Sequence, residues 1–145
     1  MNSFLGPIRL KWDGASLSGV ILPLSPPPEI SPSKNWKQGR DWYDILKLNG
    51  VELSLEGHRP FELAVWHQTG MIPWGETRSY GWIARKIDRP GVARAVGRAL
   101  GANPWPLLVP CHRVIRSDGT IGGFSSGLKW KLFLLNLEKK LIWAG

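Results

Sequence analysis

The sequence predicts an α+β fold. A small, shortened N-terminal β-sheet/helix domain, residues 1–57, is expected to support a mostly α-helical C-terminal domain, residues 58–145, that contains a helix-turn-helix. Apolar and polar residues alternate near the start of the chain, as in half-buried strands, whereas apolar residues recur at helical spacing in the second part. The charge divides in the same way. Residues 1–57 contain six Lys/Arg and six Asp/Glu, so the net charge of +8 comes entirely from residues 58–145.

Composition narrows the class of protein. The one cysteine excludes an internal disulfide and fits a reducing compartment. No apolar stretch approaches the ~20 residues that cross a bilayer, and residues 1–19 lack the apolar core of a signal peptide. The three histidines, His58, His67 and His112, have no ligand-like spacing to one another or to Cys111, so no metal site is expected. A basic C-terminal part suggests a polyanionic partner, although a merely soluble basic surface has the same composition.

Residues 1–25 are predicted to form β structure. Ile8–Trp12 alternates apolar and polar side chains, Asp13-Gly14 is a tight-turn dipeptide, and Gly19–Leu22 can supply the return strand. The segments that follow are predicted as a proline-rich loop at 23–35, a helix at 36–48 and a strand at 51–55. No residue pattern in this half indicates chemistry, so we expect it to support the second half.

The second half begins with three predicted helices. Phe61–Thr69 has apolar residues on one side and ends at Gly70. Ser79 is a suitable N-cap for a short helix up to Ile87, and residues 92–100 form another helix after a turn at 88–91. Two short helices joined by a tight turn predict a helix-turn-helix.

The outer face of the helix at 92–100 favours contact with DNA. Arg94 and Arg98 flank Gly97 on this face, so the backbone can approach a partner closely while cations lie on either side. A solvated basic helix face is the alternative. Asn103-Pro104 ends the unit, either as a simple helix stop or as a functional asparagine.

Chemistry is expected at Cys111-His112, which follows an apolar segment at 107–109 that is predicted as a short strand. A thiolate is the nucleophilic form of cysteine and requires a nearby base or cation. A buried structural cysteine is the alternative for an isolated Cys.

The last predicted helix runs from Leu128 to about Ile142. Its polar face carries Lys129, Asn136 and Lys140, and Glu138 projects to the opposite, apolar side. A carboxylate turned toward a core needs a partner. Lys131 and His112 are the two candidates, and partial exposure near a frayed C-terminus is the alternative.

The order and spacing of several motifs resemble the O6-alkylguanine-DNA alkyltransferase family. These motifs are Asn103-Pro104, Pro110-Cys111-His112-Arg113-Val114, Gly122-Gly123-Phe124-Ser125 and Gly127-Leu128, within a resemblance from about Arg59 to Glu138. The resemblance implies irreversible transfer of an alkyl group from guanine O6, or from O4-alkylthymine, onto Cys111. It implies double-stranded DNA bound through the minor groove, base flipping, a monomer and no cofactor. A cytoplasmic, nucleoid-associated protein is expected, or a nuclear one in a eukaryote.

The resemblance also assigns roles to individual residues. Glu138 orients His112, which takes the thiol proton of Cys111 through a water. Tyr80 donates to guanine N3, the Ser125 N–H donates to O6, and the Val114 carbonyl reads the exocyclic amine. Arg94 fills the vacated base stack, Asn103 bridges the helix-turn-helix and the cysteine segment, and Phe124 stands where many members have tyrosine. The remaining expected DNA contacts are Ser79, Ala93 and Arg98.

Three other functions are compatible with parts of the sequence. A non-catalytic sensor of alkyl lesions would bind damaged DNA, but such proteins lack the cysteine that is present here as Cys111. A helix-turn-helix regulator would need neither Cys111-His112 nor a buried Glu138. A cysteine hydrolase would use Cys111 and His112, but nothing in the sequence supplies an acyl-transfer site.

Overall fold

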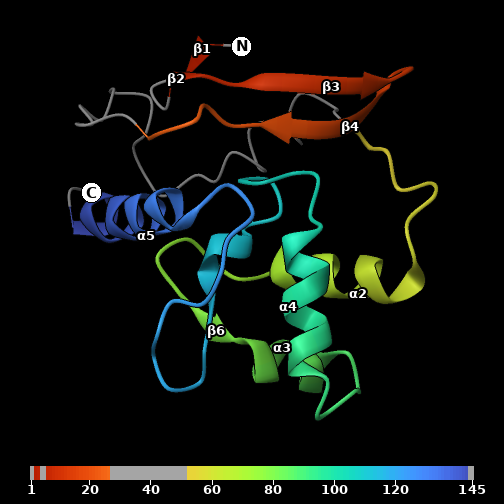
Figure 1. Ribbon diagram of the computed structural model, residues 1–145, viewed down its shortest axis with the longest axis vertical. Coiled ribbons are helices and arrows are strands. Elements are labelled where there is room, and N and C mark those ends of the chain that lie inside the picture. Colours follow the sequence, from red (N-terminus) through yellow and green to blue (C-terminus); the bar gives the residue numbers. More distant parts are fainter. Residues whose placement is uncertain (1, 4–5, 27–51, 144–145) are drawn as a thin grey trace.

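The computed structural model describes residues 2–3, 6–26 and 52–143 (Figure 1). The predicted helix at 36–48 and most of the proline-rich loop at 23–35 lie outside the described residues. Helices and small sheets occur together, so the α+β class is confirmed. None of the helices in the described ranges has the length and apolar character needed to cross a membrane.

The N-terminal part is built on the predicted hairpin. Strand β3 (Arg9–Asp13) pairs antiparallel with β4 (Ser16–Ile21), and Gly14 takes the positive φ, +59°, that the turn requires. Strand β5 (Glu52–Leu53) adds to β4 in parallel, within the strand predicted at 51–55. A further antiparallel pair, β1 (Asn2–Ser3) with β2 (Gly6–Pro7), falls within the β structure predicted for residues 1–25, although this pairing was not specified.

Four helices form most of the second part. Helix α2 (Pro60–Thr69) starts at a proline in its first turn, where the missing N–H costs nothing, and the Arg59 N–H donates to Glu62 Oε1 at 3.3 Å. Helix α3 (Tyr80–Lys86) is capped as predicted, because Ser79 Oγ accepts from the Trp82 N–H at 3.0 Å. The others are α4 (Ala93–Gly101) and α5 (Leu128–Trp143).

A tight connection joins α3 and α4. Asp88, with φ +58°, ends α3 in the left-handed region, and Gly91, with φ +90°, completes the turn. Val96, Ala99 and Leu100 of α4 are buried, whereas Arg94 and Arg98 are exposed. The apolar side of α4 therefore packs inward, and its arginines point to solvent.

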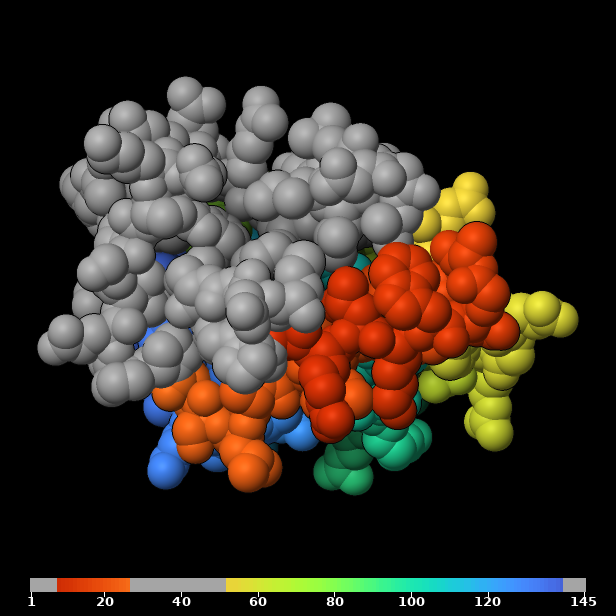
Figure 2. Space-filling view, turned by 90° about the horizontal axis from the view of Figure 1, so that it is seen from above, coloured from red at the N-terminus to blue at the C-terminus, as the bar shows by residue number. Residues whose placement is uncertain are grey.

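The hairpin and the segment just after it are held on the C-terminal part by buried Ile8, Leu17 and Val20 and by hydrogen bonds to backbone atoms. The indole N–H of Trp105 donates to the Leu17 carbonyl at 2.9 Å, and that of Trp130 donates to the Pro23 carbonyl at 2.8 Å. The Val20 N–H donates to the Pro104 carbonyl at 2.8 Å. Figure 2 shows the hairpin, in red and orange, lying over later parts of the chain. Division into domains at residue 57 stays a prediction.

The segment before the cysteine differs from the prediction. Residues 107–109 form no strand; the structure has turns there and a single β-bridge between Pro106 and Val109. The predicted strand was wrong because prolines flank this short segment and Leu107 has a φ of +77°. A short parallel pair, β6 (Arg78–Ser79) with β7 (Val114–Ile115), instead joins the start of α3 to the cysteine segment.

Candidate active site

Cys111 begins a 3₁₀ turn that ends at Arg113. Cys111 is 4% exposed, and its Sγ accepts a hydrogen bond from Asn103 Nδ2 at 3.4 Å. The same nitrogen donates to the Val109 carbonyl at 3.1 Å, while Asn103 Oδ1 accepts from the Trp105 backbone N–H at 2.9 Å. Asn103 thus ties the segment after α4 to the cysteine segment.

The thiol of Cys111 is protonated in the resting protein. Burial raises its pKa to about 11, and the hydrogen bond from Asn103 and the charge of Lys131 oppose that effect only in part. Because the thiolate is the nucleophilic form, a reaction at this sulfur needs a base that removes the proton as the new bond forms.

The raised pKa has a measurable consequence for stability. In the unfolded chain an ordinary thiol ionises below pH 9, whereas the folded protein holds the proton up to about pH 11. The protonated thiol therefore contributes to the stability of the folded state in full below pH 9, and this stabilisation is lost as the pH rises from 9 toward 11. We expect the stability difference between wild type and Cys111→Ala to fall over this range, as measured by urea unfolding at several pH values. A difference independent of pH would contradict the raised pKa.

Glu138, on the buried side of α5, is the centre of a charged cluster. Its Oε2 contacts His112 Nε2, and its Oε1 accepts from Arg113 Nε at 2.5 Å and from the Gly75 N–H at 3.2 Å. Of the two partners considered from the sequence, His112 contacts Glu138, whereas the ammonium group of Lys131 donates elsewhere.

The cluster keeps Glu138 ionised. Burial alone would raise the pKa of this carboxyl, but His112 first and Arg113 next reverse the effect, so the pKa is lowered. Arg113 is 1% exposed and also donates to the Ile72 carbonyl at 2.9 Å. The indole N–H of Trp74 donates to the Glu138 backbone carbonyl at 3.2 Å. The carboxylate therefore joins α5, the cysteine turn and the loop before β6.

One ring nitrogen of His112 is not engaged by another described group. Nδ1 is buried and finds no hydrogen-bond partner among the described residues. Phe124 packs edge-on against the imidazole, with ring centroids 6.4 Å apart. An imidazole with one nitrogen held by a carboxylate can accept a proton on the other, and the carboxylate stabilises the resulting cation.

Lys131 is a second buried cation, with no exposed surface. Its Nζ donates to the Val114 carbonyl at 2.6 Å, the Gly123 carbonyl at 3.0 Å and the Tyr80 hydroxyl at 3.5 Å. Burial lowers the pKa of Lys131 to about 8. The ammonium group links the cysteine segment, the glycine-rich segment at 122–127 and the start of α3.

A cavity of about 550 Å³ opens beside Cys111, which is large enough for a nucleobase. One wall comes from α4 and another from Arg116 and residues 122–125, and Tyr80 and Cys111 complete the lining. Gly122 packs against the Tyr80 ring: its φ is +70°, and a Cβ added there would lie 2.5 Å from the Tyr80 hydroxyl. Only glycine fits this position without moving the tyrosine.

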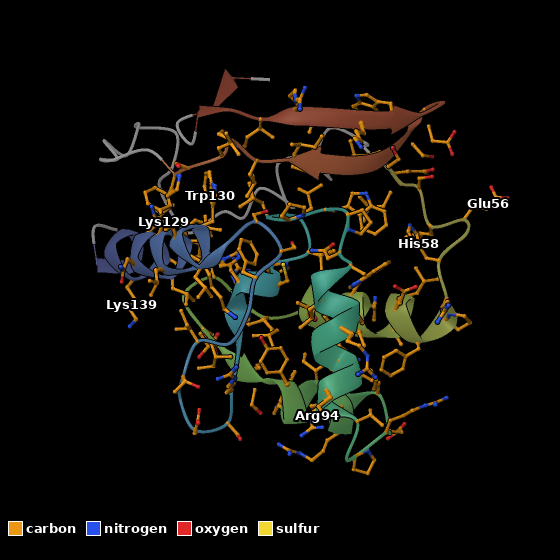
Figure 3. The ribbon with its side chains drawn as sticks, in the orientation of Figure 1. Glu56, His58, Arg94, Lys129, Trp130 and Lys139 are labelled. Carbon is orange, nitrogen blue, oxygen red and sulfur yellow. The ribbon has the colours of Figure 1, made fainter. Side chains whose placement is uncertain are left out.

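The structure brings some of the predicted site residues to this cavity and leaves others away from it. Those that line it are Cys111, Tyr80, Ala93, Arg94, Phe124 and Ser125. His112, Glu138 and Asn103 are buried behind Cys111, and Ser79 and Arg98 lie outside the lining. Val114 is buried too, and its carbonyl accepts a hydrogen bond from Lys131 Nζ. Arg94 lies on α4 at the end of the molecule far from the hairpin (Figure 3).

Two residues of the site were missed as functional groups. Arg113 was noticed only as part of the cysteine motif, and Lys131 only as a candidate partner of Glu138. The available signal was a cation directly after His112 and another on the apolar side of the last helix. Within the described ranges, no three His, Cys, Asp or Glu side chains cluster in a way that could hold a metal ion.

Comparisons with known proteins agree with this geometry. Residues 60–140 match a family described as 6-O-methylguanine DNA methyltransferase, DNA binding domain. A methylated-DNA–protein-cysteine methyltransferase of Mycobacterium leprae is 52% identical, with 96% of this chain and 90% of that protein covered. One from Methanosarcina acetivorans is 38% identical, with 94% of each covered. A Mycobacterium tuberculosis OGT crystallised in complex with DNA superimposes with a TM-score of 0.73 and 38% identity, covering 97% of this chain and 92% of that one. The chain therefore belongs to the 6-O-methylguanine DNA methyltransferase family, as its motifs predicted.

Proposed function

We propose that the protein repairs DNA by transferring the alkyl group of O6-alkylguanine to Cys111 in one irreversible turnover. The observation that carries this proposal is the buried thiol of Cys111 at a cavity large enough for a nucleobase. The next residue is His112, whose Nε2 contacts the buried carboxylate of Glu138. The product is a thioether, which is stable, so each molecule reacts once. The reaction requires no cofactor.

Bond formation and proton removal occur together at the sulfur. A lone pair of Cys111 Sγ attacks the alkyl carbon in line, and the carbon–O6 bond breaks with its electron pair passing to guanine. The thiol proton passes to His112, through a water, and Glu138 stabilises the imidazolium. The raised pKa of Cys111 makes this base necessary, because little thiolate exists beforehand.

The guanine leaving group is stabilised on the opposite side of the cavity. Tyr80 donates its proton toward N3, and the backbone N–H of Ser125 donates to O6. Lys131 supports this role, since an ammonium group only donates hydrogen bonds. Tyr80 oxygen therefore accepts from Lys131, and its own hydrogen can point into the cavity. Burial raises the pKa of Tyr80, which keeps the phenol protonated until the leaving group develops charge.

DNA is held by α3 and α4 acting as a helix-turn-helix, with the outer face of α4 in the minor groove. Ala93 and Gly97 on this helix let the backbone approach, and Arg98 and Ser79 contact the duplex. The damaged base leaves the stack at a cost of a few kcal/mol, and Arg94 fills the space. This arrangement suits a search for damage that does not depend on sequence, because the minor groove carries a degenerate code.

Stoichiometric transfer tests the proposal. The protein is incubated with duplex DNA that carries one radiolabelled O6-methylguanine, and the label on protein is counted. We expect about one label per wild-type molecule and none on Cys111→Ala, because no other thiol exists in the chain. Tight binding of the lesion without label would identify a sensor, and binding without lesion preference would identify an ordinary DNA-binding module.

A further inference from the structure

Arg116 has no role in the reaction described above, although it lines the same cavity as Cys111. It follows β7 and is exposed at the rim, whereas Cys111 and Leu100 are buried at the bottom. Arg116 and Arg94 are the two cations of the lining, and they come from different walls. The guanidinium group of Arg116 is therefore placed to contact the part of a substrate that remains outside the cavity.

The backbone at Arg116 is held in a defined turn. The Arg116 N–H donates to the Thr120 carbonyl at 2.9 Å, and the Gly119 N–H donates to the Arg116 carbonyl at 3.0 Å. Asp118 closes the turn, since its Oδ1 accepts from the Thr120 N–H at 2.9 Å and from the Thr120 hydroxyl at 2.7 Å. The guanidinium group is therefore carried by a fixed segment at the cavity rim.

In the described part of the chain no carboxylate lies within ion-pair distance of Arg116 or Arg94. Asp118, in the same turn as Arg116, has its pKa lowered mainly by hydrogen bonds from Thr120 and to a smaller extent by the charge of Arg116. The arginines that do have such partners lie elsewhere: Arg78 pairs with Glu76, and Arg113 pairs with Glu138. A guanidinium fork presents paired N–H donors that match the oxygens of an anion. Two such groups at the mouth of one cavity are suited to binding an anion.

The proposed function supplies that anion. A base that turns into the cavity remains attached to its sugar, so the phosphates on either side of it stay at the mouth. Arg94 projects from the outer face of α4 and is proposed to fill the space that the flipped base leaves in the DNA stack. Arg116 is therefore the cation of the cavity lining that remains to contact the phosphate backbone of the DNA. Building on that function, we propose that Arg116 binds a phosphate of the flipped nucleotide and thereby makes the site select nucleotides within DNA over free bases.

An alternative role for Arg116 acts through Tyr80. The charge of Arg116 opposes the rise in the pKa of Tyr80, so its removal would weaken the proton donor even without any phosphate contact. The two roles differ in their dependence on substrate. Loss of a phosphate contact affects DNA alone, whereas a weaker donor affects every substrate.

The first test is the salt dependence of binding to a duplex with one O6-methylguanine, measured in a Cys111→Ser background that cannot transfer the alkyl group. Arg116→Ala is expected to weaken binding and to reduce the slope of log K against log salt by about 1, as for one lost phosphate contact. Arg116→Lys should retain most of the slope. Arg9→Ala is the matched control: Arg9 is exposed on β3, on the opposite side of the molecule from α3 and α4 (Figure 1).

The second test compares transfer rates in the proteins that keep Cys111. Arg116→Ala should lower the ratio of the rate from duplex DNA to the rate from the nucleoside O6-methyl-2′-deoxyguanosine by about 10-fold. An unchanged salt slope, or equal losses with both substrates, would overturn the phosphate role. If the Cys111→Ser protein itself shows no preference for the lesion duplex, the proposed function fails first.

Discussion

Glu138→Gln should slow alkyl transfer about 100-fold or more and destabilise the fold by about 3–5 kcal/mol. The rate falls because a neutral amide no longer stabilises the imidazolium form of His112. The stability falls because Arg113, at 1% exposure, keeps its charge but loses its ion pair with Glu138. Single-turnover label transfer and urea unfolding at pH 7 measure the two effects.

Glu76→Gln is the matched control for this substitution. Glu76 pairs with Arg78 at 3.0 Å, but both side chains are partly exposed, and surface pairs of this kind contribute about 0–1 kcal/mol. The control should therefore keep nearly wild-type stability and rate. A Glu138→Gln protein that behaves like this control would show that the buried cluster has no catalytic or structural role.

Gly122→Ala should slow alkyl transfer by about 10–100-fold through Tyr80. The new Cβ would lie 2.5 Å from the Tyr80 hydroxyl and 3.0 Å from Cε2, so the ring must leave its place beside the cavity. The backbone adds strain of about 1–2 kcal/mol, because φ is +70°. Transfer from duplex DNA is the measurement, with unfolding experiments to separate the strain from the clash.

Gly119→Ala controls for backbone strain alone. Gly119 also has a positive φ, +88°, but a Cβ there meets no atom within 4 Å. We expect a similar loss of stability and a nearly wild-type rate. In addition, Gly122→Ala should have little further effect on rate in a Tyr80→Phe protein, since both changes remove the same hydroxyl from the cavity. Additive losses in the double variant would contradict this explanation.

The local elements of the fold could be predicted because their signals are local. Ser79 caps α3, Gly70 follows α2, and Asp13-Gly14 makes the hairpin turn, each through a short-range hydrogen bond or a permitted φ. The pair β6 with β7 could not be predicted in this way, since it joins two-residue segments that lie far apart in the sequence. The apolar segment at 107–109 was misread because a run of three apolar residues says nothing about its φ angles.

The residues of the candidate site also fall into those that the sequence could predict and those that it could not. Cys111, His112 and Glu138 could be chosen from motif order and from the position of a carboxylate on the apolar side of a helix. The buried cations Arg113 and Lys131 could not be placed, because a cation is expected at the surface unless tertiary partners are known. Several of those partners are backbone carbonyls, such as those of Val114 and Gly123 for Lys131. Every residue has a backbone carbonyl, so the pattern of side chains in the sequence does not reveal such a partner.

The hairpin is attached to the catalytic half by backbone atoms, and this has an evolutionary consequence. Leu17 and Pro23 offer carbonyls to Trp105 and Trp130, and Val20 offers its N–H to Pro104. Every non-proline residue provides both groups, so the exposed side chains of the hairpin can change without breaking these attachments, whereas Ile8, Leu17 and Val20 are buried in the shared core. Trp105 in turn donates to the asparagine that holds the cysteine segment. The exposed positions of the hairpin can therefore diverge faster than the buried residues around Cys111 while the hairpin stays attached.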